Sequence, residues 1–189
     1  MIHSKIISNG KFNNSLDLDH IEGFEYATME QSHSDVFLEV DKPGIYNADA
    51  LITKRKNLML VVKTADCMPI LISDGKKVGV IHSGWKGLEN KIFYKTISQF
   101  DVSKLKVSIG PHAQKCCYEV KQDLEKKFSK HCVKKENKIY LNLKNEIVDY
   151  CNENKIEIEL IKECTIENKK YNSYRRDKTT KRQLSTVWI

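Results

Sequence analysis

The sequence has little proline and glycine and no long apolar run. Its 189 residues include Pro 3 and Gly 8, spread too thinly to mark a linker or a domain boundary. No segment approaches the roughly 18 consecutive apolar residues that a membrane-spanning helix requires. The polar segment 1–19 lacks the apolar centre of a secretory signal peptide. We therefore expect one domain over residues 1–189 and a cytoplasmic location.

Cysteine is present without the context of a secreted protein. Two of the thiols are adjacent, and the six positions are Cys67, Cys116, Cys117, Cys132, Cys151 and Cys164. Disulfides are uncommon in reducing compartments. We therefore expect reduced thiols, some of them buried and one of them functional, rather than a disulfide framework.

The charge balance is moderately basic. There are 32 lysines and arginines against 25 acidic residues, a net charge of +7, with 40% hydrophobic and 30% charged residues. This composition predicts a globular protein that attracts an anionic ligand. Near the carboxyl end, basic residues cluster at Arg175, Arg176, Lys178, Lys181 and Arg182. A solvated surface is the simpler interpretation of this cluster. A nucleic-acid-binding module is the alternative, and it is disfavoured.

Hydrophobic periodicity predicts interleaved strands and helices. Alternating or continuous apolar runs predict strands over Ser4–Ser8, Glu25–Met29, Val36–Val40, Ala48–Thr53, Leu58–Thr64, Met68–Ser73, Val78–Ile81, Leu105–Ile109, Glu157–Ile161 and Ser185–Trp188. Apolar spacing near 3.6 residues predicts helices over Trp85–Phe100, Val120–Phe128 and Leu143–Cys151, the last capped by Asn142. The irregular alternation favours an α/β protein with a mixed sheet rather than a Rossmann fold.

Chemistry-bearing residues concentrate at the ends of two consecutive predicted strands. Asp66 and Cys67 join two apolar strands, and His82 ends the next strand before a glycine-bracketed turn. Because consecutive strands usually pair, Cys67 and His82 are expected to meet at one edge. Taken singly, Cys67 can be interpreted as a small buried thiol, and His82 as a hydrogen-bonded structural histidine.

The turn Ser83–Gly87 has some features of a phosphate-binding loop. It does not fit a Walker motif, because Trp85 separates Gly84 from Lys86. Free N–H groups at a helix start, with a nearby ammonium, still predict a weak anion site. A glycine-containing helix cap without a ligand is the alternative.

Six ordered segments resemble one known family. They are Glu30-Gln31-Ser32-His33, Ala48-Asp49-Ala50, Thr64-Ala65-Asp66-Cys67-Met68-Pro69, His82-Ser83-Gly84-Trp85-Lys86-Gly87, Gly110-Pro111 with Cys116-Cys117-Tyr118-Glu119-Val120, and Ser173-Tyr174-Arg175-Arg176-Asp177. Together they resemble the YfiH-like family, whose members are described as polyphenol oxidase laccases and as purine nucleoside phosphorylases with adenosine deaminase activity. The resemblance implies a four-layer α/β/β/α fold with mixed sheets.

The resemblance also implies a zinc site. By position in the motifs, its ligands are His33, Cys67 and His82. Three protein ligands with an open fourth position are typical of a catalytic zinc. Copper is expected only as an adventitious substitute. A multicopper oxidase needs many imidazoles, including His-X-His pairs, whereas this chain has six histidines and no such pair. The laccase description is therefore disfavoured.

The leading functional hypothesis is a zinc-dependent purine nucleoside phosphorylase. Its implied substrates are adenosine, inosine, guanosine or methylthioadenosine together with phosphate, and adenosine deamination is an implied side activity. Phosphate contacts are expected from Ser83, Lys86 and Arg175 or Arg176. Asp66 is a candidate for proton transfer, or equally for orienting a ligand.

A second enzyme hypothesis also comes from the family likeness. It is an amide hydrolase that edits a peptidoglycan precursor, with Cys67 as nucleophile and His82 as base, or with zinc-bound water. His112, which follows Gly110-Pro111, is expected to be a partly exposed loop histidine, with a local proton carrier as the alternative.

Overall fold

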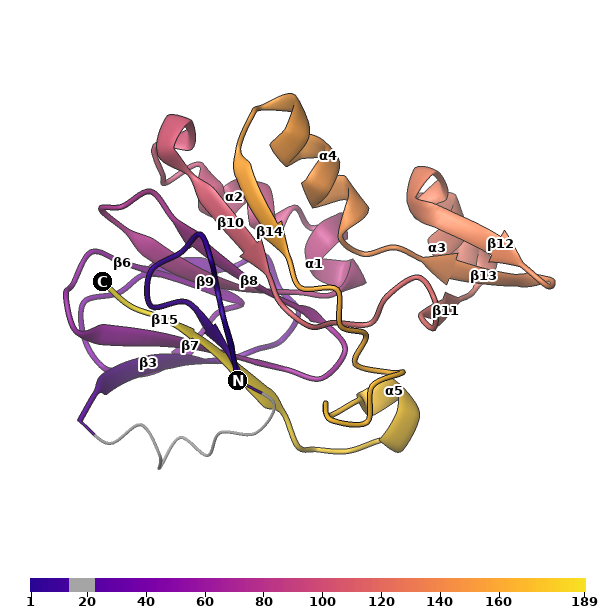
Figure 1. Ribbon diagram of the computed structural model, residues 1–189, viewed down its shortest axis with the longest axis horizontal. Helices are drawn as coiled ribbons and strands as arrows, with labels where there is room; N and C mark the ends of the chain where they lie inside the picture. The colour runs from indigo at the N-terminus through magenta and orange to yellow at the C-terminus, as the bar shows by residue number, and fades with distance from the viewer. Residues whose placement is uncertain (14–22) are drawn as a thin grey trace.

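A computed structural model describes residues 1–13 and 23–189 of the chain. Two six-stranded mixed sheets pack face to face, and helices cover the outer face of one of them (Figure 1). Residues 14–22, which contain the end of the polar amino-terminal segment, lie outside the described residues. Within the described residues, no helix is both long and apolar enough to cross a membrane.

The first sheet has the strand order β1-β2-β15-β7-β3-β5. Its strands are β1 (Ile2–His3), β2 (Lys11–Phe12), β3 (Glu25–Glu30), β5 (Gly44–Asn47), β7 (Leu58–Thr64) and β15 (Gln183–Val187). The strand β15 pairs antiparallel with both β2 and β7, whereas β3 pairs parallel with β7 and β5. The carboxyl-terminal strand is therefore central to a sheet made mainly from the first third of the chain.

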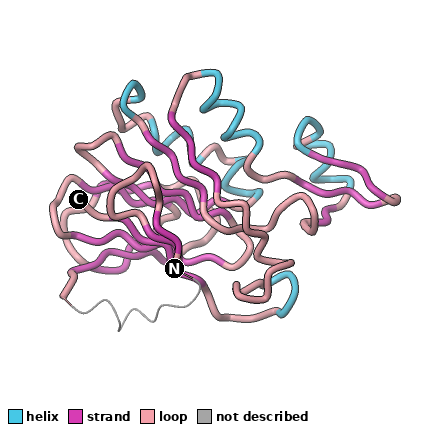
Figure 2. Tube along the Cα trace, in the orientation of Figure 1, coloured by secondary structure: helices cyan, strands magenta, loops and turns pink. Residues whose placement is uncertain are grey.

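The second sheet has the strand order β14-β10-β8-β9-β6-β4. Its strands are β4 (Phe37–Glu39), β6 (Ala50–Thr53), β8 (Met68–Ser73), β9 (Val78–Ser83), β10 (Lys106–Ile109) and β14 (Glu157–Leu160). The helices α1 (Trp85–Glu89), α2 (Ile92–Ile97) and α4 (Asn145–Glu153) contact strands of this sheet. Figure 2 shows these helices together on one side of the strands.

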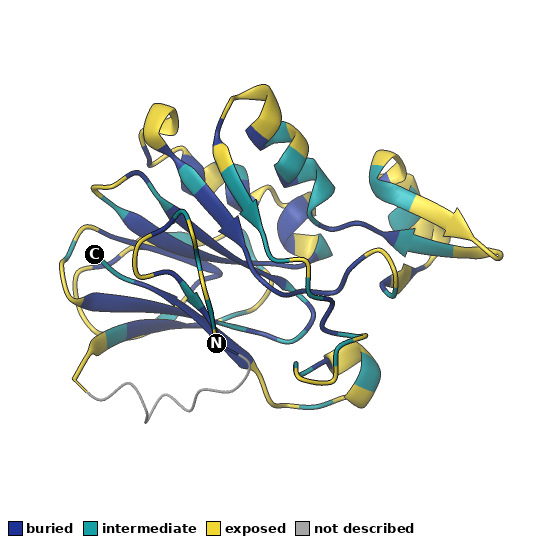
Figure 3. Ribbon diagram, viewed as in Figure 1, coloured by how far each residue is buried: buried dark blue, intermediate teal, exposed yellow. Residues whose placement is uncertain are grey.

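Alternation along the strands of the second sheet builds two cores. In β8, Met68, Ile70 and Ile72 pack in the core beneath the helices, whereas Leu71 packs between the two sheets. Successive side chains of a strand point to opposite faces, so a strand buried on both faces is apolar throughout. This explains why β8 reads as a continuous hydrophobic run, and Figure 3 shows the central strands as buried.

A small subdomain extends from the main body. It consists of the sheet β11-β13-β12, from strands Glu119–Val120, Lys138–Leu141 and Cys132–Lys135, with α3 (Gln122–Lys127). Figure 3 shows that much of this subdomain is exposed. The other helix, α5 (Tyr174–Asp177), lies in the carboxyl-terminal loop region before β15.

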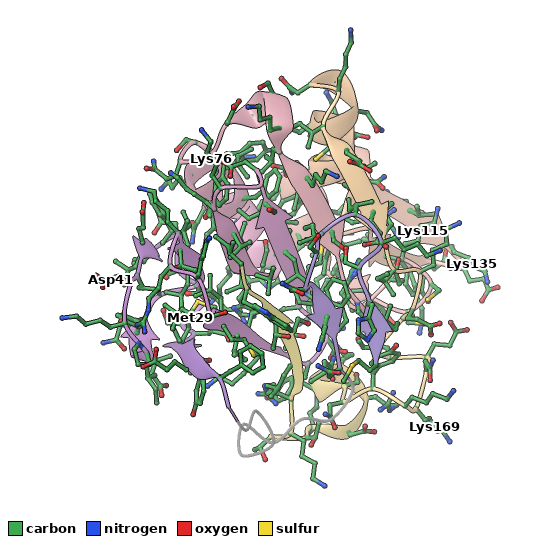
Figure 4. All side chains as sticks on the ribbon, turned by 60° about the vertical axis from the view of Figure 1, so that its left-hand side comes forward. Met29, Asp41, Lys76, Lys115, Lys135 and Lys169 are labelled. Atoms are coloured by element: carbon green, nitrogen blue, oxygen red, sulfur yellow. The ribbon has the colours of Figure 1, made fainter. Side chains whose placement is uncertain are left out.

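The predicted α/β fold with mixed sheets is confirmed. Among the described residues, however, the helices pack on the second sheet, and none packs closely on the outer face of the first. Figure 4 shows Met29 among the sheet strands and Lys115, Lys135 and Lys169 at the periphery.

Some predicted elements differ from those observed. The strand predicted over Ser4–Ser8 is wrong, because these residues form turns. The helix predicted over Trp85–Phe100 is two helices, since Lys91 adopts a left-handed conformation with φ of 62°. The residue that caps α4 is Lys144, and Asn142 instead donates its side-chain amide to Asn145.

Candidate metal centre and adjoining cavity

Three predicted metal ligands meet at one end of the two sheets. Cys67 lies between β7 and β8, His82 lies in β9, and His33 follows β3. In the antiparallel register of β8 and β9, Pro69 pairs with His82, which brings Cys67 beside that histidine. The ligand atoms of all three side chains lie within 4.8 Å of one another. The predicted meeting of Cys67 and His82 is therefore confirmed.

The buried carboxylate of Asp49 organises this cluster. It accepts a hydrogen bond from Nδ1 of His82 at 2.7 Å, which leaves Nε2 of that ring available to a ligand. It also accepts the backbone N–H groups of Ser32, His33 and Ser34 at 3.2, 3.1 and 2.6 Å. One carboxylate thus fixes one histidine ring and the loop that carries the other histidine.

The loop needs this support because His33 has φ of 63°. Few residues other than glycine adopt this left-handed conformation, and it persists where the surroundings enforce it. Asp49 organises the candidate centre, and the sequence analysis assigned it no role. The available signal was a carboxylate between Ala48 and Ala50, directly before a predominantly apolar run.

Electrostatics favours a thiolate at Cys67. Burial opposes the charged thiolate, but hydrogen bonds from His33 and His82 outweigh it and lower the pKa of Cys67 to about 6. Burial likewise opposes the imidazolium of His82, yet the bond to Asp49 and the contact with Cys67 raise its pKa to about 9. The negative charges of the Cys67 thiolate and the Asp49 carboxylate are therefore compensated by the neighbouring imidazole groups.

Glycine at position 84 makes room for the sulfur atom. A Cβ atom on Gly84 would lie 2.7 Å from Sγ of Cys67 and 3.6 Å from Cδ2 of His33. Such a contact with sulfur is far inside van der Waals distance. The glycine before α1 therefore provides the space in which the Cys67 thiolate lies.

This donor set fits a soft or borderline metal ion. Zinc accepts thiolate and imidazole ligands, and a site with three protein ligands leaves one position for solvent or substrate. Sγ of Cys67 lies 3.7 Å from Nε2 of His33, and the rings of His33 and His82 are 4.7 Å apart between centroids. His33, Cys67 and His82 can therefore hold a metal ion at the open end of the sheets.

The three ligands line a cavity of about 720 Å³. This volume is typical of a site for a small molecule. Basic side chains on its wall are Lys63, Lys86, Arg175 and Arg182, and aromatic side chains are Trp85, Tyr118 and Tyr174. The guanidinium of Arg175 stacks on the ring of Tyr118 at 5.0 Å from its centroid. The cavity combines a candidate metal centre with basic and aromatic groups, of which Lys86 and Arg175 were predicted to bind substrate and the others were not.

Two of the predicted phosphate contacts lie elsewhere. Ser83 is fully buried and does not line the cavity, and its hydroxyl faces the carbonyl oxygen of Gly84 at 3.5 Å. Arg176 donates to backbone carbonyls of Thr165 and Tyr171 at 2.8 Å each. Ser83 and Arg176 therefore serve the fold rather than the cavity. Arg175 also donates to a carbonyl oxygen, that of Glu119 at 2.6 Å, but it lines the cavity.

Asp66 connects the strand end to the carboxyl-terminal segment. Its carboxylate accepts hydrogen bonds from Oγ1 of Thr165 at 2.7 Å, Oγ of Ser173 at 3.1 Å and the backbone N–H of Arg175 at 2.6 Å. Both carboxylate oxygens are therefore engaged. This arrangement holds Arg175 at the cavity wall.

His112 is a buried histidine, so the expected partly exposed loop position is wrong. Its Nδ1 atom donates to the carbonyl oxygen of Gly110 at 2.7 Å, and the residue is 1% exposed. Burial lowers the pKa of His112 to about 4. The ring is therefore neutral at physiological pH.

The fold and the site together define a mixed α/β protein with a His-Cys-His centre. A family model described as multi-copper polyphenol oxidoreductase laccase matches residues 11–189. The chain belongs to this family, as the sequence motifs predicted.

Solved structures confirm the fold. A Neisseria meningitidis protein of the DUF152 family superposes with a TM-score of 0.80 at 25% identity, covering 91% of this chain and 78% of that chain. YfiH of Bacillus licheniformis gives a TM-score of 0.81 at 24% identity, covering 90% and 77%.

Curated relatives carry a different kind of name. A purine nucleoside phosphorylase of Aquifex aeolicus is 36% identical over 169 residues, covering 84% of this chain and 80% of the relative. A purine nucleoside phosphorylase of Clostridium acetobutylicum is 35% identical over 196 residues, covering 95% and 82%.

Proposed function

We propose that this protein is a zinc-dependent purine nucleoside phosphorylase with adenosine deamination as a side activity. The observation that carries the proposal is the convergence of His33, Cys67 and His82 with four basic side chains around one cavity. Relatives named purine nucleoside phosphorylase support it. Adenosine, inosine, guanosine and methylthioadenosine are the proposed nucleosides.

The cavity wall supplies groups for both substrates. Lys86 and Arg175 would bind phosphate, since a guanidinium offers paired donors and an ammonium offers a mobile charge. Trp85, Tyr118 and Tyr174 offer aromatic surface for a purine ring. The basic side chains would hold phosphate in place, and the negative charge of the bound phosphate would stabilise the electron-poor sugar that forms as the glycosidic bond breaks.

Zinc is the proposed cofactor, held by His33, Cys67 and His82. When bound, it would supply Lewis-acid chemistry. Asp49 keeps His82 in the tautomer that presents Nε2, and it keeps the His33 loop in place. We assign Asp66 a positioning role, because its three hydrogen bonds hold the segment that carries Arg175.

The test is the dependence of nucleoside cleavage on phosphate. Purified protein is incubated with adenosine or inosine across a phosphate series, and free base and ribose 1-phosphate are measured by chromatography. A phosphorylase releases both products only with phosphate. Equal base release without phosphate would refute the proposal.

Substitution of a cavity lysine tests the proposed phosphate contact directly. Lys86→Ala is expected to raise the phosphate concentration needed for half-maximal rate without changing zinc content, because Lys86 binds the anion and not the metal. Lys76→Ala is the matched control, since Lys76 is an exposed lysine outside the cavity (Figure 4).

The second candidate function is that of an amide hydrolase acting on a peptidoglycan precursor. The observation that favours it is the thiolate of Cys67 between two imidazoles, an arrangement that also activates a cysteine nucleophile. An amide hydrolase is indifferent to phosphate. Cleavage of a muropeptide amide, with no turnover of any purine nucleoside, would transfer the assignment to this candidate.

A further inference from the structure

A second cluster of sulfur atoms lies outside the cavity. Sγ atoms of Cys116, Cys117 and Cys164 all lie within 4.8 Å of one another, and those of Cys116 and Cys117 are 2.9 Å apart. All three are free thiols. Cys164 is 5% exposed, whereas Cys116 is exposed to solvent. The cluster therefore has a buried inner end and an open outer end.

Two separate loops bring the sulfur atoms together. Cys116 and Cys117 belong to the turn that follows β10, and Cys164 lies in the segment that follows β14. These segments run beside each other in Figure 1, and His112 forms a parallel bridge with Cys164. The backbone pairing of these two segments therefore holds the Cys116–Cys117 turn close to Cys164.

Burial raises the pKa of Cys116 and of Cys117, so a metal ion must displace the thiol protons when it binds. The backbone N–H of Gln114 donates to Sγ of Cys164 at 3.4 Å, which helps to fix the position of this sulfur atom. Lys144, whose charge interacts with Cys116 and Cys164, adds positive charge close to the cluster. Thiolates, not thiols, are the form that binds metals.

We propose that Cys116, Cys117 and Cys164 form a second metal site, which binds a thiophilic cation of the zinc class. Three thiolates suit such ions and leave one position for solvent, and the carboxylate of Glu167 lies nearby, with Oε2 4.0 Å from Sγ of Cys116. Zinc–sulfur bonds of about 2.3 Å place the sulfur atoms of one tetrahedral site about 3.8 Å apart. The close pair of Cys116 and Cys117 must therefore open by about 1 Å, which the exposed Cys116 side chain can accommodate.

A metal ion accounts for the cluster better than a disulfide does. A bond between any two of these cysteines leaves the third sulfur without a partner, whereas one ion engages all three. The cluster shares no ligand with the candidate metal centre, so metal binding here can be tested without nucleoside turnover. Its next residues along the chain are Tyr118, on the cavity wall, and Thr165, which donates to Asp66. Occupancy would therefore brace the two loops behind the cavity.

The test uses the full chain with Cys67→Ala, which removes a ligand of the first centre and leaves the second cluster intact. Cadmium is titrated into the fully reduced, metal-free protein under argon, and thiolate-to-cadmium absorption in the ultraviolet is recorded. Equilibrium dialysis with elemental analysis gives the stoichiometry. The expected result is one cadmium bound through the cluster per chain, displaced by added zinc.

Additional serine variants identify the ligands. Adding Cys164→Ser is expected to weaken cadmium binding at least about tenfold, since even groups that only orient metal ligands contribute on this scale. Adding Cys116→Ser tests the same site at an exposed position where folding is not at risk. Cys132→Ser is the matched control, because this cysteine belongs to neither cluster. Unchanged binding after both Cys116→Ser and Cys164→Ser, or no binding at all with three free thiols, would overturn the proposal.

Discussion

Nδ1 of His82 donates to the buried carboxylate of Asp49 over 2.7 Å. The same carboxylate accepts the N–H groups of Ser32, His33 and Ser34. Asp49 is 0% exposed, so these bonds are shielded from water. The two histidines of the candidate metal centre thus share one organising residue, although they lie 49 positions apart in the sequence.

Asp49→Asn should weaken zinc binding by about 10- to 100-fold, the range expected when a group that orients metal ligands is changed. The amide removes the negative charge and presents donors where His82 and the loop N–H groups also donate. Zinc affinity is measured by competition with a chromophoric chelator. Asp35→Asn is the control, because Asp35 is a surface partner of Lys95. Equal affinity in the Asp49 variant and in the wild type would contradict the assigned role.

Single alanine substitutions of His33, Cys67 and His82 should each lower the zinc content by about one ion per chain, because a three-ligand site retains only two ligands. Elemental analysis of proteins purified in parallel measures the difference from the wild type. Cys151→Ala offers a control, because this thiol belongs to neither cluster of candidate ligands. If Cys67→Ala retained the full wild-type zinc content, the ligand assignment would fail.

Gly84→Ala should reduce zinc affinity while leaving the fold intact. Gly84 has φ of −92°, a conformation open to alanine, but the added methyl group would lie 2.7 Å from Sγ of Cys67. The sulfur must move away from its present position. Circular dichroism checks the fold, and chelator competition measures the affinity. An unchanged zinc affinity would show that Sγ of Cys67 does not need the space that Gly84 leaves.

The family resemblance implied the three metal ligands, whereas the apolar strand patterns predicted only that Cys67 and His82 meet at one edge of the sheet. Leu58–Thr64 and Met68–Ser73 are observed with the predicted bounds, which fixes Cys67 between them. The role of Asp49 was not predictable in this way. Its partners come from a loop and from another strand, and only tertiary structure brings them together.

The same limit applies to the two neighbouring arginines. Arg175 and Arg176 have the same chemistry in the sequence, and both were predicted to bind substrate. In α5, Arg175 lines the cavity and donates once, to the carbonyl oxygen of Glu119, whereas Arg176 donates to several backbone carbonyls of the preceding loop. Short helices place adjacent residues on different sides, so local sequence alone did not separate the two roles.

This difference gives a paired prediction. Arg175→Ala should raise the KM for phosphate with little change in the melting temperature. Arg176→Ala should lower stability by about 1–3 kcal/mol, since it leaves part-buried carbonyls without their donor. Phosphate-dependent kinetics and thermal unfolding of both variants are compared with the wild type. Similar effects of the two substitutions would refute the division of roles.

The hydrogen bonds of the Glu159 carboxylate lead us to expect a pH-dependent contribution to stability. Its carboxylate lies in β14 and accepts hydrogen bonds from Oγ of Ser4 and Oγ of Ser108 at 2.6 Å each, and from the N–H of Lys5 at 3.0 Å. Burial opposes the charge, but these bonds outweigh it and lower the pKa of Glu159. A group whose folded-state pKa is depressed stabilises the fold above its unfolded-state pKa, and this contribution is lost as pH falls through the folded-state value.

Glu159→Gln should therefore destabilise the protein by about 1–2 kcal/mol near pH 7, and the difference from the wild type should shrink towards pH 3. Urea unfolding of both proteins across this range measures the free energies. Glu153→Gln is the control, because Glu153 is exposed at the end of α4 and should give no such trend. A difference between wild type and Glu159→Gln that stayed constant with pH would mean that side-chain shape, rather than the charged hydrogen bonds to Ser4 and Ser108, determines the effect.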